Sequence, residues 1–380
     1  MNDLERYRQE IDRIDSQLVR LFEERMQVCE SVAQYKIKTG RQVLDPERER
    51  QKIAAVREKA HGPFNEFGVQ ELFRQIMAIS RKRQYQLLNG TGLTKEEDFS
   101  VIGQLPRKGV TVVFQGVEGA YSYGAMRTYF EEDIRSYHVR TFRDAMEEVA
   151  QGRADFAVLP IENSTAGIVA DIYDLLMEFS LYIVGEQIIK VEHVLLGLPG
   201  ASLSDVRRVY SHPQGLSQCR RYLEDHPQWK PVEAENTAGA AKKVSRDGDP
   251  SQAAIAGKAA GEVFGLRVLA EDICENQQNS TRFIILGREP VYEENAEKVS
   301  ICFEADHESG TLYNMLSHII YNGLNMTKIE SRPIPGRNWE YRFFVDFDGN
   351  LRGSSVKNAL RGIREEANAF RVLGNYGSNG

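Results

Sequence analysis

Cysteine is scarce in this chain of 380 residues, and no spacing typical of a metal site is present. The four cysteines, Cys29, Cys219, Cys274 and Cys302, lie far apart and form no CxxC pair, which argues against a disulfide framework and a thiolate metal cage. The seven histidines show no HExxH or similar ligand spacing. We therefore predict buried, reduced thiols and no metal.

Long apolar runs and an excess of positive charge are also missing. No stretch has the roughly 18 apolar residues of a membrane-spanning helix, and the first residues lack the apolar core of a signal peptide. Lys and Arg number 48 against 55 Asp and Glu, a formal charge of -7 that offers no concentrated basic face to nucleic acid. We expect a cytoplasmic protein with neither a membrane nor a nucleic acid as partner.

The apolar pattern that is present changes twice along the chain. It is helical from Leu4 to about Leu88, and from Val110 short β-branched runs alternate with helical ones. From Val299 the order is strand, helix, strand, strand, helix, strand, which is the ferredoxin-like pattern. The sequence therefore predicts a multidomain protein with an all-α, an α/β and an α+β domain.

Turn residues and charges separate these regions at 89–108 and 288–298. The predicted domains are 1–90, 109–287 and 298–376. The predicted elements of the α/β region are strands at 110–115, 156–160, 182–190, 206–211 and 283–286, with helices at 142–150 and 238–245. Thr141 and Asp144 form a capping box before the first of these helices.

One residue of the first helix does not fit its apolar seam. The seam has heptad spacing and contains Ile11, Ile14, Leu18, Leu21, Arg25, Val28, Val32 and Tyr35. A buried guanidinium is costly without an anion, so Arg25 should meet a carboxylate. Lys36 points to nearly the same side about 16 Å further along, whereas Arg8 is rotated by about 100° and could serve a second subunit.

The second and third predicted helices carry further polar residues at defined places. Asp45 and Pro46 form an N-cap and first-turn signal. In the third helix, Ser80 and Gln84 continue a stripe that begins as apolar side chains. Taken one at a time, such residues are more often structural, as in a small helical dimerisation domain.

Together, these residues resemble the all-helical chorismate mutase family over nearly all of residues 1–90. The residues that carry the resemblance are Arg8, Arg25, Lys36, Asp45, Arg48, Glu49, Ser80 and Gln84. The resemblance implies that Arg25, with Arg8 from a partner chain, holds the carboxylates of chorismate, while Lys36 and Gln84 donate to its ether oxygen. Glu49 would bind the ring hydroxyl, supported by Asp45, Arg48 and Ser80, in an intertwined dimer.

Polar residues follow the predicted strands of the α/β region. Glu162, Asn163 and Ser164 are expected in a loop between a strand and the helix at 169–179, where ligands often bind. Gln218 ends the similar segment Ser211–Gln218. The alternative interpretation is that these residues only form helix caps and tight turns. Gly116 and Gly119 lack the third glycine of the GxGxxG fingerprint, which argues against a dinucleotide-binding dehydrogenase.

With Thr281-Arg282-Phe283, placed where a polar loop returns into a strand, these motifs resemble prephenate dehydratase. That family has two α/β lobes around a cleft, like periplasmic binding proteins, with hinges expected near 185–191 and 270–280. The residues implied for the cleft are Glu162, Asn163, Ser164, Gln218, Thr281 and Arg282. Thr281 would donate to the leaving hydroxyl of prephenate, and Arg282 would hold its side-chain carboxylate. No cofactor is implied, because aromatisation drives the step.

The last region resembles the amino-acid-binding ACT domain of phenylalanine-inhibited dehydratases. The residues concerned are Gly310, Thr311, Leu312, Glu330, Ser331, Arg332 and Pro333. Thr311 and Ser309 depart from the usual family residues. The resemblance implies phenylalanine as an allosteric inhibitor bound between two paired units.

We therefore predict a bifunctional enzyme of phenylalanine biosynthesis that acts on chorismate and then on prephenate, as a homodimer or higher homo-oligomer. One alternative is a prephenate dehydratase alone, with the N-terminal helices as a dimerisation arm. Another is an amino-acid sensor, because two-lobed α/β folds and ACT units both bind small ligands. Arg25 and Lys36 argue against the first alternative, and Thr281 beside Arg282 against the second.

Overall fold

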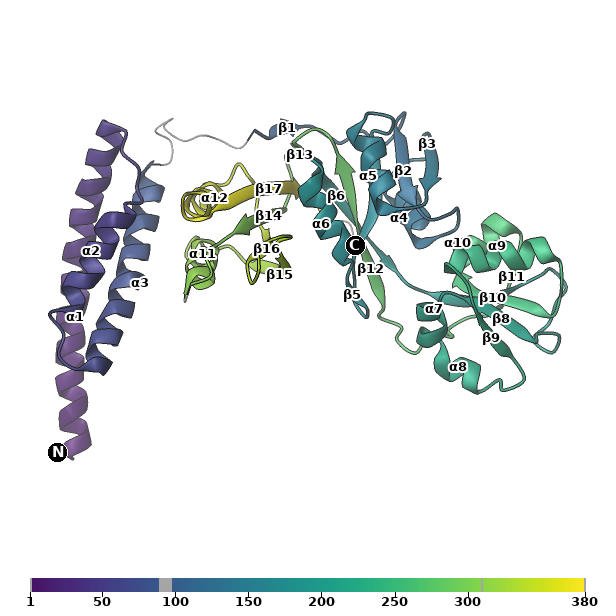
Figure 1. Ribbon diagram of the computed structural model, residues 1–380, viewed down its shortest axis with the longest axis horizontal. Coiled ribbons are helices and arrows are strands. Elements are labelled where there is room, and N and C mark those ends of the chain that lie inside the picture. Colours follow the sequence, from purple (N-terminus) through teal and green to yellow (C-terminus); the bar gives the residue numbers. More distant parts are fainter. Residues whose placement is uncertain (1, 89–97, 309, 379–380) are drawn as a thin grey trace. The chain divides into compact units, whose positions relative to one another are not determined.

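The computed structural model of the chain describes residues 2–88, 98–308 and 310–378 (Figure 1). Two compact units are present: a first unit, Met1–Glu97 with Val299–Val372, and a second unit, Asp98–Lys298 with Leu373–Gly380. Residues 89–97 of the predicted first linker and Ser309 lie outside the described residues. Among the described residues, no helix is long and apolar enough to span a bilayer.

The N-terminal part of the first unit consists of three helices, α1 (Asp3–Thr39), α2 (Pro46–Arg57) and α3 (Pro63–Leu88). The predicted start of α2 is confirmed, because the Asp45 side chain accepts a hydrogen bond from the Arg48 amide. Gly40 ends α1 in a left-handed conformation (φ 66°), which only glycine adopts readily. Helices α1 and α2 both pack against α3.

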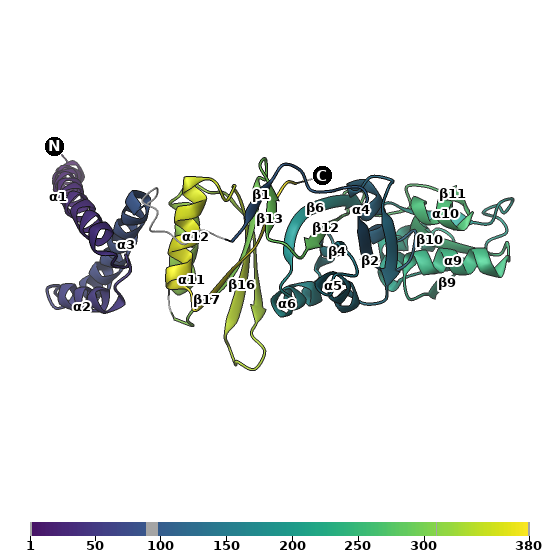
Figure 2. The same cartoon turned by 90° about the horizontal axis from the view of Figure 1, so that it is seen from above.

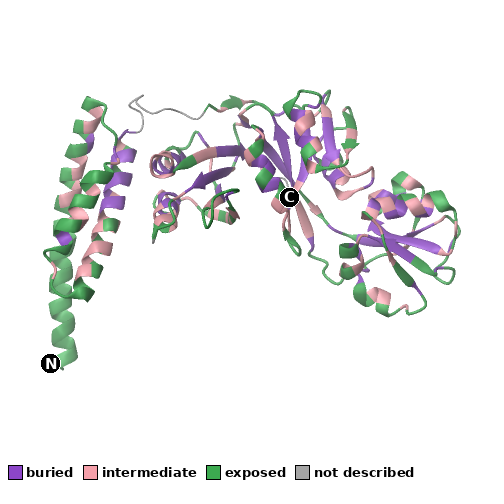
Figure 3. Cartoon of the chain, in the orientation of Figure 1, coloured by how far each residue is buried: buried purple, intermediate pink, exposed green. Residues whose placement is uncertain are grey.

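The predicted heptad seam of α1 faces solvent in the single chain. Ile11, Leu18 and Val28 are 55%, 51% and 60% exposed, and the exposed colour covers the N-terminal half of the helix in Figure 3. Contiguous exposed apolar surface of this kind is rare on monomeric proteins. The seam is therefore available to a partner.

The C-terminal region follows the predicted ferredoxin-like order, and all of it except its two ends, Lys298 and residues 373–376, belongs to the first unit. Its elements are β14 (Lys298–Glu304), α11 (Thr311–Ile320), β15 (Met326–Pro333), β16 (Tyr341–Asp348), α12 (Ser354–Glu366) and β17 (Ala369–Tyr376). The strands are ordered β15-β16-β14-β17. Helix α3 packs against α12, where Tyr85 donates to Glu365 at 2.6 Å, and Lys82 donates to Ser317 of α11 at 2.9 Å.

Two large sheets of the second unit form the two predicted lobes. The first lobe has strand order β6-β12-β4-β2-β3, and the second has β11-β7-β10-β8-β9. The strands of the first lobe are β2 (Thr111–Gln115), β3 (Arg135–Val139), β4 (Phe156–Asn163), β6 (Tyr182–Lys190) and β12 (Ser280–Gly287). Those of the second are β7 (His193–Gly197), β8 (Arg208–Ser211), β9 (Lys230–Glu233), β10 (Gln252–Gly257) and β11 (Arg267–Ala270).

Helices cover both faces of the sheet in the first lobe. Helices α5 (Phe142–Ala150) and α6 (Ala170–Glu178) lie on one face and α4 (Tyr121–Tyr129) on the other (Figure 2). The capping box predicted at Thr141 and Asp144 is confirmed at the start of α5. The helices of the second lobe are α7 (Pro213–Gln218), α8 (Arg220–Glu224), α9 (Thr237–Asp247) and α10 (Lys258–Phe264).

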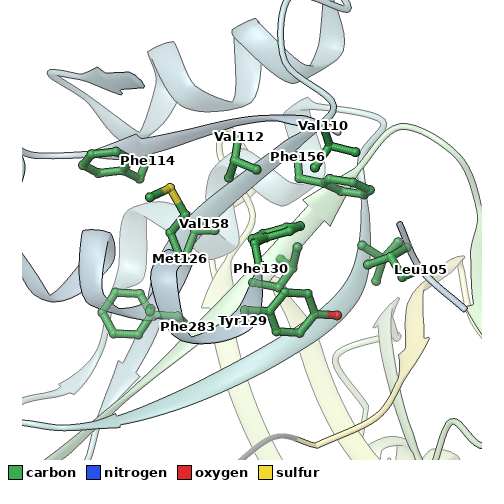
Figure 4. Packing of buried hydrophobic residues seen from close by; sticks show 13 residues of the cluster. Leu105, Val110, Val112, Phe114, Met126, Tyr129, Phe130, Phe156, Val158 and Phe283 are labelled. Carbon is green, nitrogen blue, oxygen red and sulfur yellow. The ribbon is translucent and has the colours of Figure 1, made fainter. Parts of the chain in front are cut away.

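The core of the first lobe fixes one end of the Thr281-Arg282-Phe283 triplet. Phe283 is 2% exposed and packs in a cluster with Phe114 and Met126 (Figure 4). Burying a phenylalanine side chain contributes about 1.5–3 kcal/mol, so Phe283 anchors β12 in the sheet. The two polar residues before it are thereby held at the edge of a rigid core.

The lobes are joined by the segments predicted as hinges. Strand β6 ends at Lys190 and β7 begins at His193, while residues 271–279 lead from β11 back to β12 (Figure 1). The lobes also approach closely at Gly119, where an added Cβ would lie 2.8 Å from the Ala260 Cα. A larger residue at this position would push the lobes apart.

Two short strand pairs were not predicted. Strand β1 (Ser100–Ile102) pairs in parallel with β13 (Val291–Glu293), and β5 (Gly167–Ile168) pairs with the end of β4. Two or three residues are too few for an alternating pattern to be recognised. The first predicted linker, 89–108, therefore contains a strand at 100–102.

Candidate active sites

The polar residues of the first lobe lie on neighbouring strands rather than in loops. In the pairing of β4 with β12, Glu162 is opposite Arg282 and Asn163 is opposite Thr281. The prediction that Glu162 and Asn163 belong to a loop was wrong, as was the loop position of Thr281, because strand pairing continues through all of them. A β-bulge shifts the register between Arg282 and Phe283, a feature often found beside active sites.

Asn163 orients the Thr281 hydroxyl. The Asn163 Oδ1 accepts hydrogen bonds from the Thr165 and Ala166 amides at 3.0 and 2.8 Å, which turns its Nδ2 toward β12. This Nδ2 donates to the Thr281 Oγ1 at 2.9 Å and to the Asn279 Oδ1 at 2.8 Å. Because Thr281 accepts from Asn163, its own proton is free to be donated to a ligand.

The remaining first-lobe residues surround this pair. The Arg282 guanidinium lies 3.7 Å from the Glu162 carboxylate and donates through Nε to the buried Glu186 at 2.7 Å. Ser164 accepts from the Ser280 amide at 3.0 Å, which fastens the ends of β4 and β12 together. The predicted residues Glu162, Asn163, Ser164, Thr281 and Arg282 are thus brought together at one end of two strands.

Gln218 belongs to the second lobe and is held by two residues that the sequence analysis missed. The Gln218 Oε1 lies 2.9 Å from the His193 Nε2, and the His193 Nδ1 lies 2.9 Å from the Tyr121 hydroxyl. Burial lowers the pKa of His193, which favours the neutral ring in which Tyr121 donates to Nδ1 and Nε2 donates to Gln218. In this contact the Gln218 Oε1 accepts, so the contact does not use the Gln218 amide donors.

We expect His193 to make the second unit sensitive to acid. Its folded pKa lies below the usual value of about 6.5, so the unfolded chain binds more protons, and stability falls as pH drops from about 6.5 through the folded pKa. Urea unfolding at about pH 7.5 and about pH 5.5 should show a larger loss for the natural chain than for His193→Gln. His61→Gln, at an exposed position, is the control, and equal losses in all three proteins would contradict the prediction.

The cysteines are closer together than their sequence positions suggest. The Cys219 and Cys274 sulfurs lie 3.9 Å apart, and both thiols are free. The expectation of buried thiols holds for Cys219 and Cys302, whereas Cys29 and Cys274 are half-buried. A hydrogen bond with Cys219 lowers the pKa of Cys274 to about 7.

In the three helices, the two cations predicted for one ligand have neutral partners. The Arg25 Nη1 donates to the Ser80 hydroxyl at 2.5 Å, so the expected carboxylate is replaced by a hydroxyl on α3. The Lys36 ammonium donates to the Val43 carbonyl at 2.5 Å, and its pKa is lowered by burial. Both charges therefore remain unneutralised by these contacts and can still attract an anion.

Glu49 is held by an arginine that the sequence analysis did not single out. The Arg81 Nη1 contacts both Glu49 oxygens at 2.6 and 2.7 Å, and Arg81 also pairs with Glu366 of α12 at 2.8 Å. Gln84 is buried, and its Oε1 has no hydrogen-bond partner among the described residues. An unpaired buried amide oxygen is costly, so the Gln84 Oε1 can accept a hydrogen bond from a further donor.

One cavity among the described residues of the first unit contains a single predicted mutase residue, Glu49. A cavity of about 890 Å³ in the first unit is lined by Glu49 and Arg81 but not by Arg25 or Lys36. Arg8, Asp45 and Arg48 are exposed.

The predicted regulatory residues occupy two elements of the first unit. Gly310 precedes α11 in a left-handed conformation (φ 87°), and Thr311 lines the 890 Å³ cavity. Leu312 is half-buried. Glu330, Ser331, Arg332 and Pro333 end the edge strand β15, paired with β16. Among the described residues, no group of three His, Cys, Asp or Glu side chains is placed to hold a metal ion.

Comparison with known families matches two regions of the chain. Residues 7–85 match the model of chorismate mutase type II, and residues 112–291 match that of prephenate dehydratase. The chain thus combines a mutase-type helical region with a dehydratase-type α/β region. The prephenate dehydratase of Arthrobacter aurescens, solved with L-Phe, is 33% identical, with a TM-score of 0.65 over 70% of this chain and 90% of its own.

Full-length relatives carry both regions in one chain. The bifunctional chorismate mutase/prephenate dehydratase of Enterobacter agglomerans is 34% identical over 99% of this chain and 96% of its own. That of Escherichia coli (strain K12) is 34% identical over 99% and 97%. The chain therefore belongs to the bifunctional chorismate mutase/prephenate dehydratase family. A structure described as GqqA, a novel type of quorum quenching acylase, is also 34% identical, with a TM-score of 0.66 over 71% of this chain and 98% of its own.

Proposed function

We propose that the chain converts chorismate to prephenate in its three-helix region and prephenate to phenylpyruvate in its second unit. The observation that carries this proposal is the pairing of Thr281 with Asn163 across two strands, since the hydroxyl oxygen accepts from Asn163 and its proton can be donated to a ligand. A sensor would not need such a donor. The family relation over 99% of the chain supports the first reaction as well as the second.

The mutase reaction needs positioning and charge complementarity but no acid, base or nucleophile, because chorismate rearranges by a pericyclic step. Arg25 holds a carboxylate of chorismate, and Lys36 and Gln84 donate to the ether oxygen as its bond breaks. Glu49 binds the ring hydroxyl, with its carboxylate oriented by Arg81. The neutral partners of Arg25 and Lys36 support these roles.

This mutase site is completed in a homodimer. The exposed seam of α1, including Ile14 at 46% and Leu21 at 54%, supplies an apolar surface for a second copy. Arg8 lies on the same helix and is exposed, so a second subunit can bring it to the site of the first. Asp45, Arg48 and Ser80 support the ligand from α2 and α3.

In the dehydratase reaction the ring hydroxyl and carbon dioxide leave together, and the new aromatic ring supplies the driving force. Thr281 donates to the departing hydroxyl, a weak-acid role that suits a step with a strong driving force. Gln218 donates from the second lobe, and Glu162 and Ser164 complete the polar surface. Arg282 holds the side-chain carboxylate of prephenate, for which it remains 12% exposed beside Glu162.

Phenylalanine is the proposed allosteric inhibitor. The related Arthrobacter aurescens enzyme was solved in complex with L-Phe. The proposed ligand residues are Gly310, Thr311, Leu312, Glu330, Ser331, Arg332 and Pro333. Inhibition requires that phenylalanine bind one arrangement of the chain more tightly than another, since equal affinity shifts no equilibrium.

One assay tests both reactions and the regulation. The purified chain is given chorismate, with and without phenylalanine, and prephenate and phenylpyruvate are measured over time. We expect prephenate to appear first and phenylpyruvate to follow, more slowly when phenylalanine is present. Phenylpyruvate formed only from added prephenate would leave the helices as a dimerisation arm, and no turnover of either substrate would contradict the proposal.

A further inference from the structure

A completely buried carboxylate lies directly behind the proposed dehydratase site. Glu186, on β6, is 0% exposed and faces β12. An isolated charge in such a position would cost several kcal/mol. Two cations compensate for it: Arg282 donates from Nε at 2.7 Å, and the Lys298 ammonium forms an ion pair with the other oxygen. The Ser378 hydroxyl donates to that same oxygen at 2.5 Å.

The partners of Glu186 come from both ends of the C-terminal region. Lys298 is the first residue of β14, and Ser378 follows the last residue of β17. The Asn375 side chain donates to the Lys298 carbonyl at 2.9 Å, which fastens the two ends together. Residues 298 and 375–378 therefore belong to the surroundings of Glu186, although some 75 residues of chain separate them from one another.

The end of β17 lies close against β6. Gly374 pairs with Ile183, and an added Cβ on Gly374 would lie only 2.0 Å from the Ile183 carbonyl oxygen. Only glycine permits this approach. The close contact fixes the following residues, including the 1%-exposed Tyr376, against the strand that carries Glu186.

Arg282 is held from three directions as a result. Its Nε donates to Glu186, its Nη2 donates to the Tyr376 hydroxyl at 3.0 Å, and its Nη1 lies 3.7 Å from Glu162. When two edges of a planar guanidinium are fixed by hydrogen bonds, only its remaining edge can bind a ligand. The orientation of the Arg282 edge beside Glu162 is thus determined by residues at the two ends of the C-terminal region.

We propose that Glu186, Lys298 and Tyr376 are positioning residues of the dehydratase site, so that the chain after Leu373 completes the site in which Arg282 acts. This inference rests on the proposed dehydratase function. The four side chains carry balanced charges: the two cations, Arg282 and Lys298, face the two carboxylates of Glu186 and Glu162. Removal of Lys298 or Glu186 therefore changes the field at Glu162 as well as the position of Arg282.

Three variants test the proposal against a matched control. Glu186→Gln and Lys298→Met should lower the dehydratase kcat by about tenfold to hundredfold, because displacement of a positioning group by about 1 Å has effects of this size. Tyr376→Phe, which removes one hydroxyl, should lower it by less, and Lys298→Arg should restore most of the activity. The control, Tyr137→Phe, removes a 2.6 Å hydrogen bond to Glu148 in the same unit and should have no effect.

The readouts separate positioning from stability and from the proposed function itself. Chorismate consumption, which belongs to the first unit, and the melting temperature should stay near the values of the unmodified chain. Unchanged dehydratase kcat and KM in Glu186→Gln and Tyr376→Phe would overturn the inference. So would a parallel loss of melting temperature and of both activities that Lys298→Arg does not rescue. An unmodified chain that makes no phenylpyruvate from prephenate would instead overturn the proposed function.

Discussion

Replacement of Arg25 by alanine should abolish chorismate consumption while leaving the dehydration of added prephenate intact. Arg25 is the seam cation whose contact to Ser80 is a neutral hydrogen bond, so its charge is available to a substrate carboxylate. Loss of one such charge-stabilising donor typically lowers kcat about hundredfold to thousandfold. The two reactions should separate because Arg25 and Thr281 lie in different compact units.

The measurement is the rate of loss of chorismate, with the rate of phenylpyruvate formation from supplied prephenate taken on the same sample. Arg83→Ala is the matched control, because Arg83 also joins α3 to α1, through a 2.7 Å pair with Glu30 at the surface. We expect nearly full activity in both assays for this control. Equal losses of both activities in Arg25→Ala would contradict the assignment of separate sites.

The second large effect is expected at Thr281. Thr281→Ala should let prephenate accumulate from chorismate, with phenylpyruvate formation lowered by about a hundredfold to ten-thousandfold, the usual range for loss of a proton donor. Thr281→Ser should keep much of the activity, since it retains the hydroxyl that Asn163 orients.

Thr128→Ala serves as the control, because the Thr128 hydroxyl bonds to the Gly124 carbonyl on the exposed side of α4. Product analysis by chromatography distinguishes prephenate from phenylpyruvate in each sample. Normal phenylpyruvate output from Thr281→Ala would remove Thr281 from the mechanism, and the Asn163 contact would then be purely structural.

The sequence predicted correctly those helices and strands whose bounds are determined by neighbouring residues. The bounds of α5 and β6 were predicted correctly, since the first has a capping box and the second contains two β-branched pairs, Ile183-Val184 and Ile188-Ile189. The strand positions of Glu162 and Thr281 were missed, because each strand is extended by pairing with the other across more than a hundred residues of sequence. A run of polar residues at a strand end has the same sequence pattern as a loop, so the two cannot be distinguished until the partner strand is known.

The same limit applies to the residues that hold the site. Gln218 was predicted from its motif, but His193 and Tyr121 were not, since both lie far from Gln218 in the sequence and belong to no shared motif with it. Glu186 carried a signal that could have been used: an acidic residue directly after the apolar run Ile183-Val184-Gly185 in a buried strand requires a cationic partner. The identity of that partner, Arg282, follows only from the fold.

The hinge between the lobes and the chemistry of the dehydratase share the same strands. Thr281 is the second residue of β12, which follows the segment 271–279 that returns from the second lobe. The other connection to the second lobe begins where β6 ends, at Lys190, four residues after Glu186. We expect a change in the angle between the lobes to act on the backbone next to Thr281. In the proposed mechanism, opening of the lobes would then disturb the alignment of the Thr281 hydroxyl, so that product release and loss of catalytic alignment would be a single motion.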